Sequence, residues 1–162
     1  MSICYIGIGS NLGNPVAQAK QAIVALKSLD SLSVLDVSSL YASKPMGPQD
    51  QPDYVNAVAK ISTSLSPLQL LDQLQHIEQH SGRVRKDERW GPRTLDLDIL
   101  LIDDLMIDEP RLTVPHYGMH CREFVLYPLF EIEPQLTLPN KVTLKDLVEN
   151  CPRNGLDIFT NA

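Results

Sequence analysis

Six segments of regular hydrophobic patterning follow one another in the first two thirds of the chain, and their order limits the folds available to it. Four of them have strand length and are wholly apolar or alternate between apolar and polar side chains: 3–9, 33–41, 54–61 and 95–102. Two longer segments repeat apolar residues at every third or fourth position: 15–30 and 66–82. The order is therefore strand, helix, strand, strand, helix, strand.

The two helical segments each begin with a capping residue followed by proline, a common helix start: Asn14-Pro15 and Ser66-Pro67. This order of elements predicts a two-layer α+β sandwich, with helices packed on one face of a mainly antiparallel sheet. That is the ferredoxin-like plan. After residue 105 we expect Pro-rich irregular chain with two further helices, at about 123–130 and 143–150.

Composition narrows the class of protein. A chain of 162 residues with 43% hydrophobic content is typical of one globular domain, and we expect residues 1–162 to form it. The net charge of -6 disfavours a general nucleic-acid binder. The three cysteines are scattered and lack Cys-x-x-Cys spacing, which disfavours disulfides and zinc. No segment predicts a signal peptide or a membrane span, so we expect a soluble cytoplasmic protein with reduced thiols.

The strongest functional signal is a basic segment that runs into two aspartates. Five cations stand within residues 83–93, namely Arg83, Arg85, Lys86, Arg89 and Arg93. Trp90 lies among them and could cover a base or a ribose. Guanidinium groups bind phosphate oxygens in bidentate geometry, and carboxylates hold the divalent cations that phosphate chemistry uses. The segment therefore predicts a polyphosphate site.

The two aspartates, Asp96 and Asp98, are two positions apart on a predicted strand. They should share one face of it, with Cα atoms roughly 6.6 Å apart, a separation that lets carboxylates converge on two metal ions about 3.5 to 4 Å apart. Taken alone, the Asp-x-Asp pattern favours a solvated polar face, and the neighbouring arginines reverse that preference. The cations alone could also form a solvated basic loop. No Gly-x-x-x-x-Gly-Lys run is present, which excludes a P-loop.

A second candidate region follows a loop rich in proline and glycine. Tyr54 and Asn56 should lie on one strand face beside that loop, where an aromatic ring and a carboxamide suit a flat heterocycle. Taken alone, a packed tyrosine and a turn-stabilising asparagine are the favoured interpretation. Further support comes from an imidazole, a cation and aromatic rings at His116, Tyr117, Arg122 and Phe124. The four histidines show no metal-ligand spacing.

Together these segments resemble a known family. Residues 5–12, 47–54, 89–100 and 112–117 are similar to motifs of the 6-hydroxymethyl-7,8-dihydropterin pyrophosphokinases of the folate pathway. The resemblance extends from about residue 5 to residue 134. Two features depart from it: Lys44 stands where a smaller or apolar residue is expected, and the last thirty residues carry no motif of the family.

The resemblance implies an activity and a set of site residues. It implies a ferredoxin-like, Mg²⁺-dependent diphosphotransferase that moves the pyrophosphoryl group of ATP onto the hydroxymethyl oxygen of the pterin and releases AMP. Asp96 and Asp98 would hold two magnesium ions, and Arg83 and Arg93 would stabilise transition-state charge. The pterin would contact Ser43, Lys44, Pro45, Met46, Tyr54, Asn56 and Phe124. ATP would contact Gln75, Glu78, Arg85, Trp90, Arg93, Ile99, Arg111, Thr113, His116, Tyr117 and Arg122.

Within that interpretation we expect a monomer that binds ATP and the pterin but neither nucleic acid nor membrane. Loops 42–53 and 82–94 would close over bound ATP. Asp98 is a candidate proton acceptor, and the alternative is a metal-polarised hydroxyl that needs no dedicated base. Two alternatives stay open. One is an RNA-binding module of the RRM type, which the missing aromatic-rich motif and the negative charge disfavour. The other is a nucleotide sensor that binds ATP without turning it over.

Overall fold

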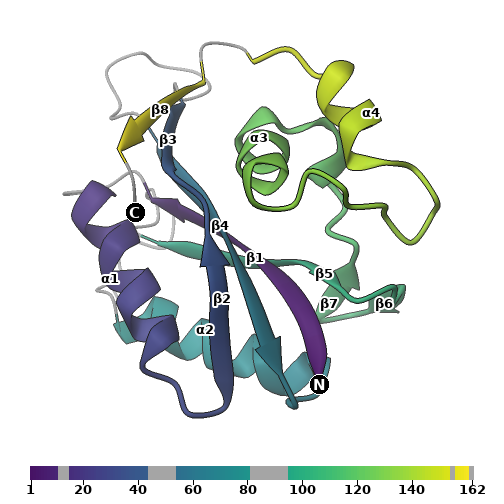
Figure 1. Ribbon diagram of the computed structural model, residues 1–162. Coiled ribbons are helices and arrows are strands. Elements are labelled where there is room, and N and C mark those ends of the chain that lie inside the picture. The colour runs from purple at the N-terminus through teal and green to yellow at the C-terminus, as the bar shows by residue number, and fades with distance from the viewer. Residues whose placement is uncertain (11–14, 44–53, 81–94, 154–155, 161–162) are drawn as a thin grey trace.

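The computed structural model describes residues 1–10, 15–43, 54–80, 95–153 and 156–160 (Figure 1). Its centre is a six-stranded sheet in the order β5-β1-β4-β3-β8, with β2 also pairing with β4. Here β2 is Leu32–Val37, β3 is Leu40–Ser43 and β8 is Asp157–Thr160. Each of these pairs is antiparallel. The central strands are β1 (Ser2–Ser10) and β4 (Tyr54–Thr63), and β5 (Asp96–Ile102) lies at one edge. The predicted ferredoxin-like α+β fold is confirmed.

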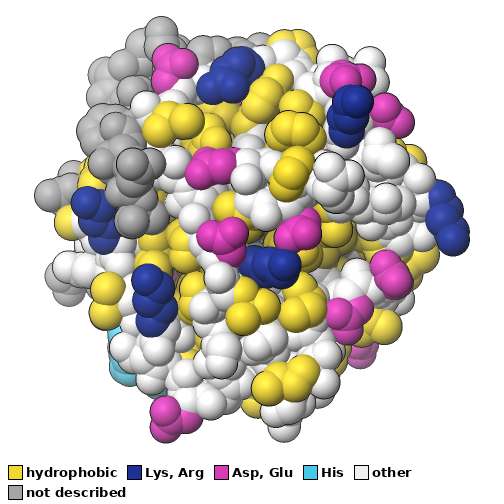
Figure 2. Space-filling model, viewed as in Figure 1, with side chains coloured by type: hydrophobic (Ala, Val, Ile, Leu, Met, Phe, Trp, Pro, Cys, Tyr) yellow, Lys and Arg dark blue, Asp and Glu magenta, His cyan; other side chains and the backbone are white. Residues whose placement is uncertain are grey.

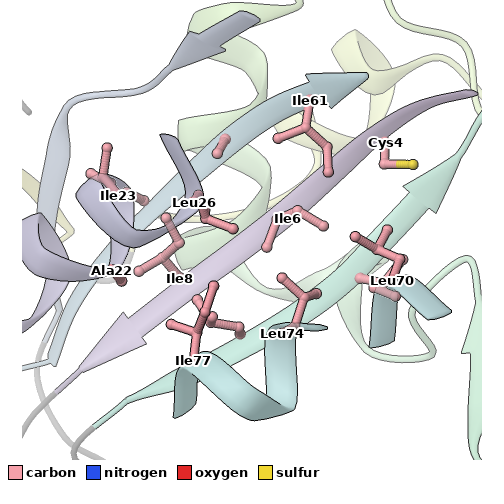
Figure 3. Packing of buried hydrophobic residues seen from close by; sticks show 14 of the residues in the cluster. Cys4, Ile6, Ile8, Ala22, Ile23, Leu26, Ile61, Leu70, Leu74 and Ile77 are labelled. Carbon is pink, nitrogen blue, oxygen red and sulfur yellow. The ribbon is translucent and has the colours of Figure 1, made fainter. Parts of the chain in front are cut away.

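One face of the sheet is covered by the two expected helices, α1 (Pro15–Lys27) and α2 (Pro67–His80). Helix α2 begins as its sequence predicts, because the Ser66 and Gln69 side chains each accept a hydrogen bond from the other residue's backbone N–H, at 3.2 and 3.0 Å. Apolar side chains of both helices pack on the sheet and form the first core cluster (Figure 3), including Ile6, Ile8, Ile23, Leu26, Ile61, Leu70, Leu74 and Ile77.

The opposite face carries a second layer that the sequence analysis did not assign to it. Helices α3 (Glu123–Ile132) and α4 (Leu144–Glu149) lie on the other side of the sheet from α1 and α2 (Figure 1). Both helices were expected, at about 123–130 and 143–150. Their apolar faces form a second core cluster with side chains of the sheet, including Tyr5, Val58, Leu100, Leu101, Val125, Leu126, Leu129 and Leu144. Periodicity identified these helices, but it could not say which face they cover.

The segment expected as one strand over 33–41 is instead two strands, β2 (Leu32–Val37) and β3 (Leu40–Ser43). The break falls at Ser38 and Ser39, whose polar groups bond outside the regular ladder. Ser38 Oγ accepts a hydrogen bond from the Val58 backbone N–H at 2.9 Å and donates one to the Ser39 carbonyl at 2.8 Å. Serine side chains that bond the backbone in this way compete with strand pairing.

The chain after residue 105 contains more regular structure than expected. A short hairpin joins β6 (Ile107–Glu109) to β7 (Leu112–Val114), and β8 (Asp157–Thr160) pairs with β3. The expectation of irregular chain is wrong at these positions, because strands of three or four residues are too short to show a period of two. Among the described residues, no helix has the length and apolar character needed to span a membrane.

Glu131 of α3 binds the chain at the break between β2 and β3 and stabilises it. Its carboxylate accepts hydrogen bonds from the Ser39 backbone N–H (3.0 Å), the Ser39 hydroxyl (3.0 Å) and the Tyr41 hydroxyl (2.6 Å). We expect Glu131→Ala to lower the free energy of unfolding by about 1–2 kcal/mol, a modest loss because Glu131 is exposed. Urea denaturation measures it. Glu149→Ala, at an exposed carboxylate of α4, is the control, and equal unfolding midpoints for both variants would contradict this role.

Two buried tyrosines should make the fold sensitive to alkali. Burial, and then the negative charge of Glu133, raise the pKa of Tyr5 from 10.0 to about 12. Burial, and then the hydrogen bond to Glu131, also raise the pKa of Tyr41 above its usual 10.0. The unfolded chain therefore releases these protons first, so stability should be full below pH 10 and fall as pH rises toward 12. Urea midpoints at pH 8 and pH 11 test this, and equal midpoints at the two pH values would refute it.

Candidate active site

The edge strand β5 separates its side chains onto the two faces of the sheet. Leu97 and Ile99 are each 3% exposed and belong to the first core cluster, under α1 and α2. Asp96 and Asp98 alternate with them and therefore lie on the opposite face, where Asp98 is exposed and Asp96 is half-buried. The structure thus places both carboxylates on one accessible face, which is the arrangement that the spacing predicts. Their role as metal ligands stays a prediction.

Strands β1 and β4 continue this face beside the aspartates. Gly9 lies opposite Asp96 on one side and opposite Asn56 on the other. Because glycine has no side chain, the floor between the carboxylate and the buried carboxamide is backbone. Among the described residues, a Cβ added to Gly9 would meet only Asn56 Oδ1, at 3.3 Å. Tyr54 lies two positions from Asn56 on the same strand and so shares this face.

Gly9 is a candidate site residue that the sequence analysis did not single out. It ends the predicted strand 3–9, and in the structure the strand continues to Ser10. A glycine inside a strand often marks a close approach of a ligand to the backbone, and that signal could have identified it. Gly7, two positions earlier, has a different neighbour, because a Cβ there would meet the Leu100 side chain at 3.4 Å.

A β-bulge in β5 lies just after the aspartates, at the point where the strand bonds to the segment 115–122. Tyr5 pairs with Leu101 and Ile6 with Ile99, so Leu100 has no partner in the register. The Leu100 carbonyl accepts a hydrogen bond from the His116 backbone N–H at 3.0 Å. Burial lowers the pKa of His116, and the negative charge of Asp98 opposes this shift. The imidazole therefore lies within electrostatic reach of Asp98.

Aromatic rings and a guanidinium group follow His116. The rings of His116 and Tyr117 stack with centroids 5.0 Å apart. Arg122 Cζ lies 5.6 Å from the Tyr117 ring centroid and 5.8 Å from that of Phe124, at the start of α3. The structure therefore brings together His116, Tyr117, Arg122 and Phe124, which the sequence analysis named as supporting residues.

The remaining described candidates lie around α2 and the β6–β7 hairpin. Arg111 Nη2 lies 2.6 Å from Asp72 Oδ1 and 3.2 Å from Gln75 Oε1, so the structure joins two predicted ATP contacts and adds Asp72. Thr113 is exposed on β7. Glu78 is buried and accepts a hydrogen bond from the Leu97 backbone N–H. Ile99 packs in the first core cluster, on the face opposite the aspartates.

Several predicted site residues lie outside the described part of the chain: Arg83, Arg85, Trp90, Arg93, Lys44, Pro45 and Met46. The Ser43 backbone ends β3, and its side chain also lies outside the described part. Their roles stay predictions.

The carboxylate pair fits one kind of metal site. No group of three or more His, Cys, Asp or Glu side chains able to hold a metal ion occurs in the described ranges. Magnesium does not need such a cage, because it is commonly bound by one or two carboxylates together with phosphate oxygens of the substrate. Asp96 and Asp98 supply that donor set on an accessible face.

The fold and this face define the class of protein: a ferredoxin-like α+β domain with a carboxylate pair, a guanidinium group and aromatic rings on one side of its sheet. The chain belongs to the 7,8-dihydro-6-hydroxymethylpterin-pyrophosphokinase (HPPK) family, whose model matches residues 5–134.

Two relatives match over nearly their whole length, and both are named 2-amino-4-hydroxy-6-hydroxymethyldihydropteridine pyrophosphokinase. The protein of Haemophilus influenzae is 58% identical over 149 residues, which are 92% of each chain. That of Pseudomonas aeruginosa is 52% identical over 158 residues, 98% of this chain and 97% of the relative.

Solved structures confirm the fold. Wild-type Plasmodium falciparum HPPK-DHPS with pteroate has a TM-score of 0.72 at 14% sequence identity, and the same protein with SDX-DHP has a TM-score of 0.68 at 13%. These matches cover 91% and 92% of this chain. The chain spans less than half of those longer chains, 42% and 43%.

Proposed function

We propose that this protein transfers the pyrophosphoryl group of ATP to the hydroxymethyl group of 6-hydroxymethyl-7,8-dihydropterin and releases AMP, in a Mg²⁺-dependent reaction of folate biosynthesis. The observation that carries this proposal is membership of the pyrophosphokinase family over residues 5–134, with relatives of that name at 58% and 52% identity. The accessible face bearing Asp96 and Asp98 supplies a place for the chemistry.

The proposed mechanism assigns this chain's residues to binding and positioning. Asp96 and Asp98 would hold two magnesium ions, and bound Mg²⁺ would supply charge neutralisation for the phosphate oxygens. Phosphoryl-transfer enzymes act mainly through placement of the reactants and stabilisation of charge. We assign that stabilisation to Arg83 and Arg93, with Asp98 as the candidate acceptor of the hydroxyl proton.

We assign the pterin to the face that bears the aspartates, and ATP to the adjoining β5 edge of the sheet. Asn56 reads the polar edge of the pterin over the backbone floor at Gly9, and the ring stacks between Tyr54 and Phe124. As the family resemblance implies, we also assign pterin contacts to Ser43, Lys44, Pro45 and Met46. We assign ATP to the region bounded by α2, the β6–β7 hairpin and the segment 115–122, with contacts from Gln75, Glu78, Arg85, Trp90, Ile99, Arg111, Thr113, His116, Tyr117 and Arg122.

We further propose that the enzyme is a cytoplasmic monomer and that residues 1–162 form one pyrophosphokinase domain. The net charge of -6 supports small-molecule substrates rather than nucleic acid. Figure 2 agrees for the face that it shows, where Lys and Arg side chains are scattered among acidic ones. Light scattering after size exclusion tests the oligomeric state. RNA affinity measured against salt concentration tests the RRM-type alternative, which predicts a steep loss as salt rises.

Removal of magnesium should abolish turnover. The protein is incubated with ATP, MgCl₂ and the reduced hydroxymethylpterin, and AMP is quantified by chromatography. We expect AMP and pyrophosphorylated pterin in equal amounts, with no AMP after EDTA treatment and recovery when excess Mg²⁺ is restored, because the carboxylates need the cation to engage the phosphates. ATP binding without AMP would support a nucleotide sensor instead, and undiminished AMP formation in EDTA would refute the magnesium assignment.

A further inference from the structure

Glu78 is a buried carboxylate beside the strand that carries both aspartates. It lies on α2 and is 7% exposed, and its Oε2 accepts a hydrogen bond of 2.7 Å from the Leu97 backbone N–H. Leu97 is the residue between Asp96 and Asp98. The contact therefore reaches the strand at the midpoint of the candidate metal site.

The position of β5 in the sheet explains why this contact matters. Among the described strands, β5 is last in the sheet order and pairs with β1 on one side. No strand in the described part of the chain pairs with its outer edge, and backbone groups at such an edge need other partners. Glu78 bonds this edge at the Leu97 N–H, and the His116 N–H bonds it again at the Leu100 carbonyl. Along the strand, one contact lies before Asp98 and the other after it.

We propose that Glu78 is a positioning residue that fixes the backbone between Asp96 and Asp98, so that their carboxylates converge on one metal-bound nucleotide. This inference rests on the proposed function. Groups that orient metal ligands without touching the metal typically change its affinity 10- to 100-fold when they are removed. Family resemblance implies a contact between Glu78 and ATP. The geometry adds a distinct role, the hydrogen bond to the Leu97 N–H. This role depends more on a side chain long enough to place an acceptor oxygen there than on its negative charge.

Three substitutions separate reach from charge. Glu78→Gln keeps an acceptor oxygen at the same distance and loses the charge. Glu78→Asp keeps the charge but is one methylene shorter, which withdraws the acceptor from Leu97. Glu78→Leu keeps approximate size and has no acceptor. Glu109→Gln, at an exposed carboxylate of β6, is the matched control for loss of charge.

The primary readout is the affinity for Mn²⁺ in the presence of α,β-methylene-ATP, obtained from the electron paramagnetic resonance signal of free Mn²⁺. We expect Glu78→Leu and Glu78→Asp to weaken Mn²⁺ binding about 10- to 100-fold, and Glu78→Gln to recover most of that loss. The Mg²⁺ concentration for half-maximal AMP formation should rise in the same order. Nucleotide affinity in EDTA is measured separately, because Glu78 is also assigned an ATP contact, and Mn²⁺ affinity is compared at a nucleotide concentration that saturates each variant.

Two results would overturn the proposal: wild-type Mn²⁺ affinity in Glu78→Asp, or a loss in Glu78→Gln as large as that in Glu78→Asp. Thermal unfolding shows which variants are folded at the assay temperature, and the Gln and Asp variants decide the question if Glu78→Leu is not. Mn²⁺ affinity does not depend on turnover. Absence of AMP with the wild-type protein would therefore count against the proposed function, separately from the role of Glu78.

Discussion

Replacing Asp98 by alanine should lower kcat for AMP formation by about a thousandfold or more while leaving the protein folded. The substitution removes one of two carboxylates assigned to the metal ions, and preorganised charge of this kind is the largest single contribution in many phosphoryl-transfer sites. Asp98 is exposed on β5, so its loss leaves no cavity in either core cluster. Quenched-flow or steady-state measurement of AMP, with urea denaturation in parallel, tests both parts of the prediction.

The matched control for this variant is Asp104→Ala, which removes an exposed carboxylate from the turn that follows β5. It should retain wild-type turnover, because the turn lies beyond the far end of the strand from Asp96. Turnover near the wild-type value in Asp98→Ala would refute the metal assignment. Equal losses in the two variants would point to a general effect of negative charge on this part of the surface.

Replacing Gly9 by valine should raise KM for the pterin about 30- to 100-fold, with a much smaller change in KM for ATP. A Cβ added at this position would lie 3.3 Å from Asn56 Oδ1, and the two methyl groups of valine would occupy the floor on which a flat ring must lie. Valine is well suited to a strand, so the fold should persist. Steady-state kinetics with each substrate varied in turn provide the measurement.

Gly7→Ala is the comparison for that variant. The added Cβ would meet the Leu100 side chain at 3.4 Å, an ordinary contact beside the second core cluster and away from Asn56. It should change KM for the pterin by less than about threefold. An unchanged KM for the pterin in Gly9→Val, or an equal rise in both substrates, would contradict the assignment of Gly9 to the floor of the pterin pocket.

Local patterning was sufficient to predict most of the fold. In residues 54–61, Val55, Ala57, Ala59 and Ile61 were predicted to share one face, and they do so in the strand found there, because side chains of a strand alternate between its two faces. Helix α2 begins at Pro67 because the capping residue and the proline act within one turn. The second helical layer required information that no single segment contains, namely that both faces of the sheet are apolar around Val58 and Leu100.

Contacts between distant residues account for what the sequence could not reveal. The break between β2 and β3 depends on Glu131, which lies 92 positions after Ser39. The role of Glu78 at Leu97 depends on a contact across 19 positions and on the place of β5 at the edge of the sheet. The bulge at Leu100, which brings His116 toward Asp98, has no signature in the run Leu-Leu-Ile.

The most direct test of the central claim is the position of metal in crystals of the protein soaked with Mn²⁺ and α,β-methylene-ATP, located by anomalous scattering. The account predicts anomalous peaks between the Asp96 and Asp98 carboxylates, about 2.1 Å from their oxygens and in contact with phosphate oxygens of the nucleotide. Nucleotide-bound metal held at any other place, with neither aspartate among its ligands, would contradict it.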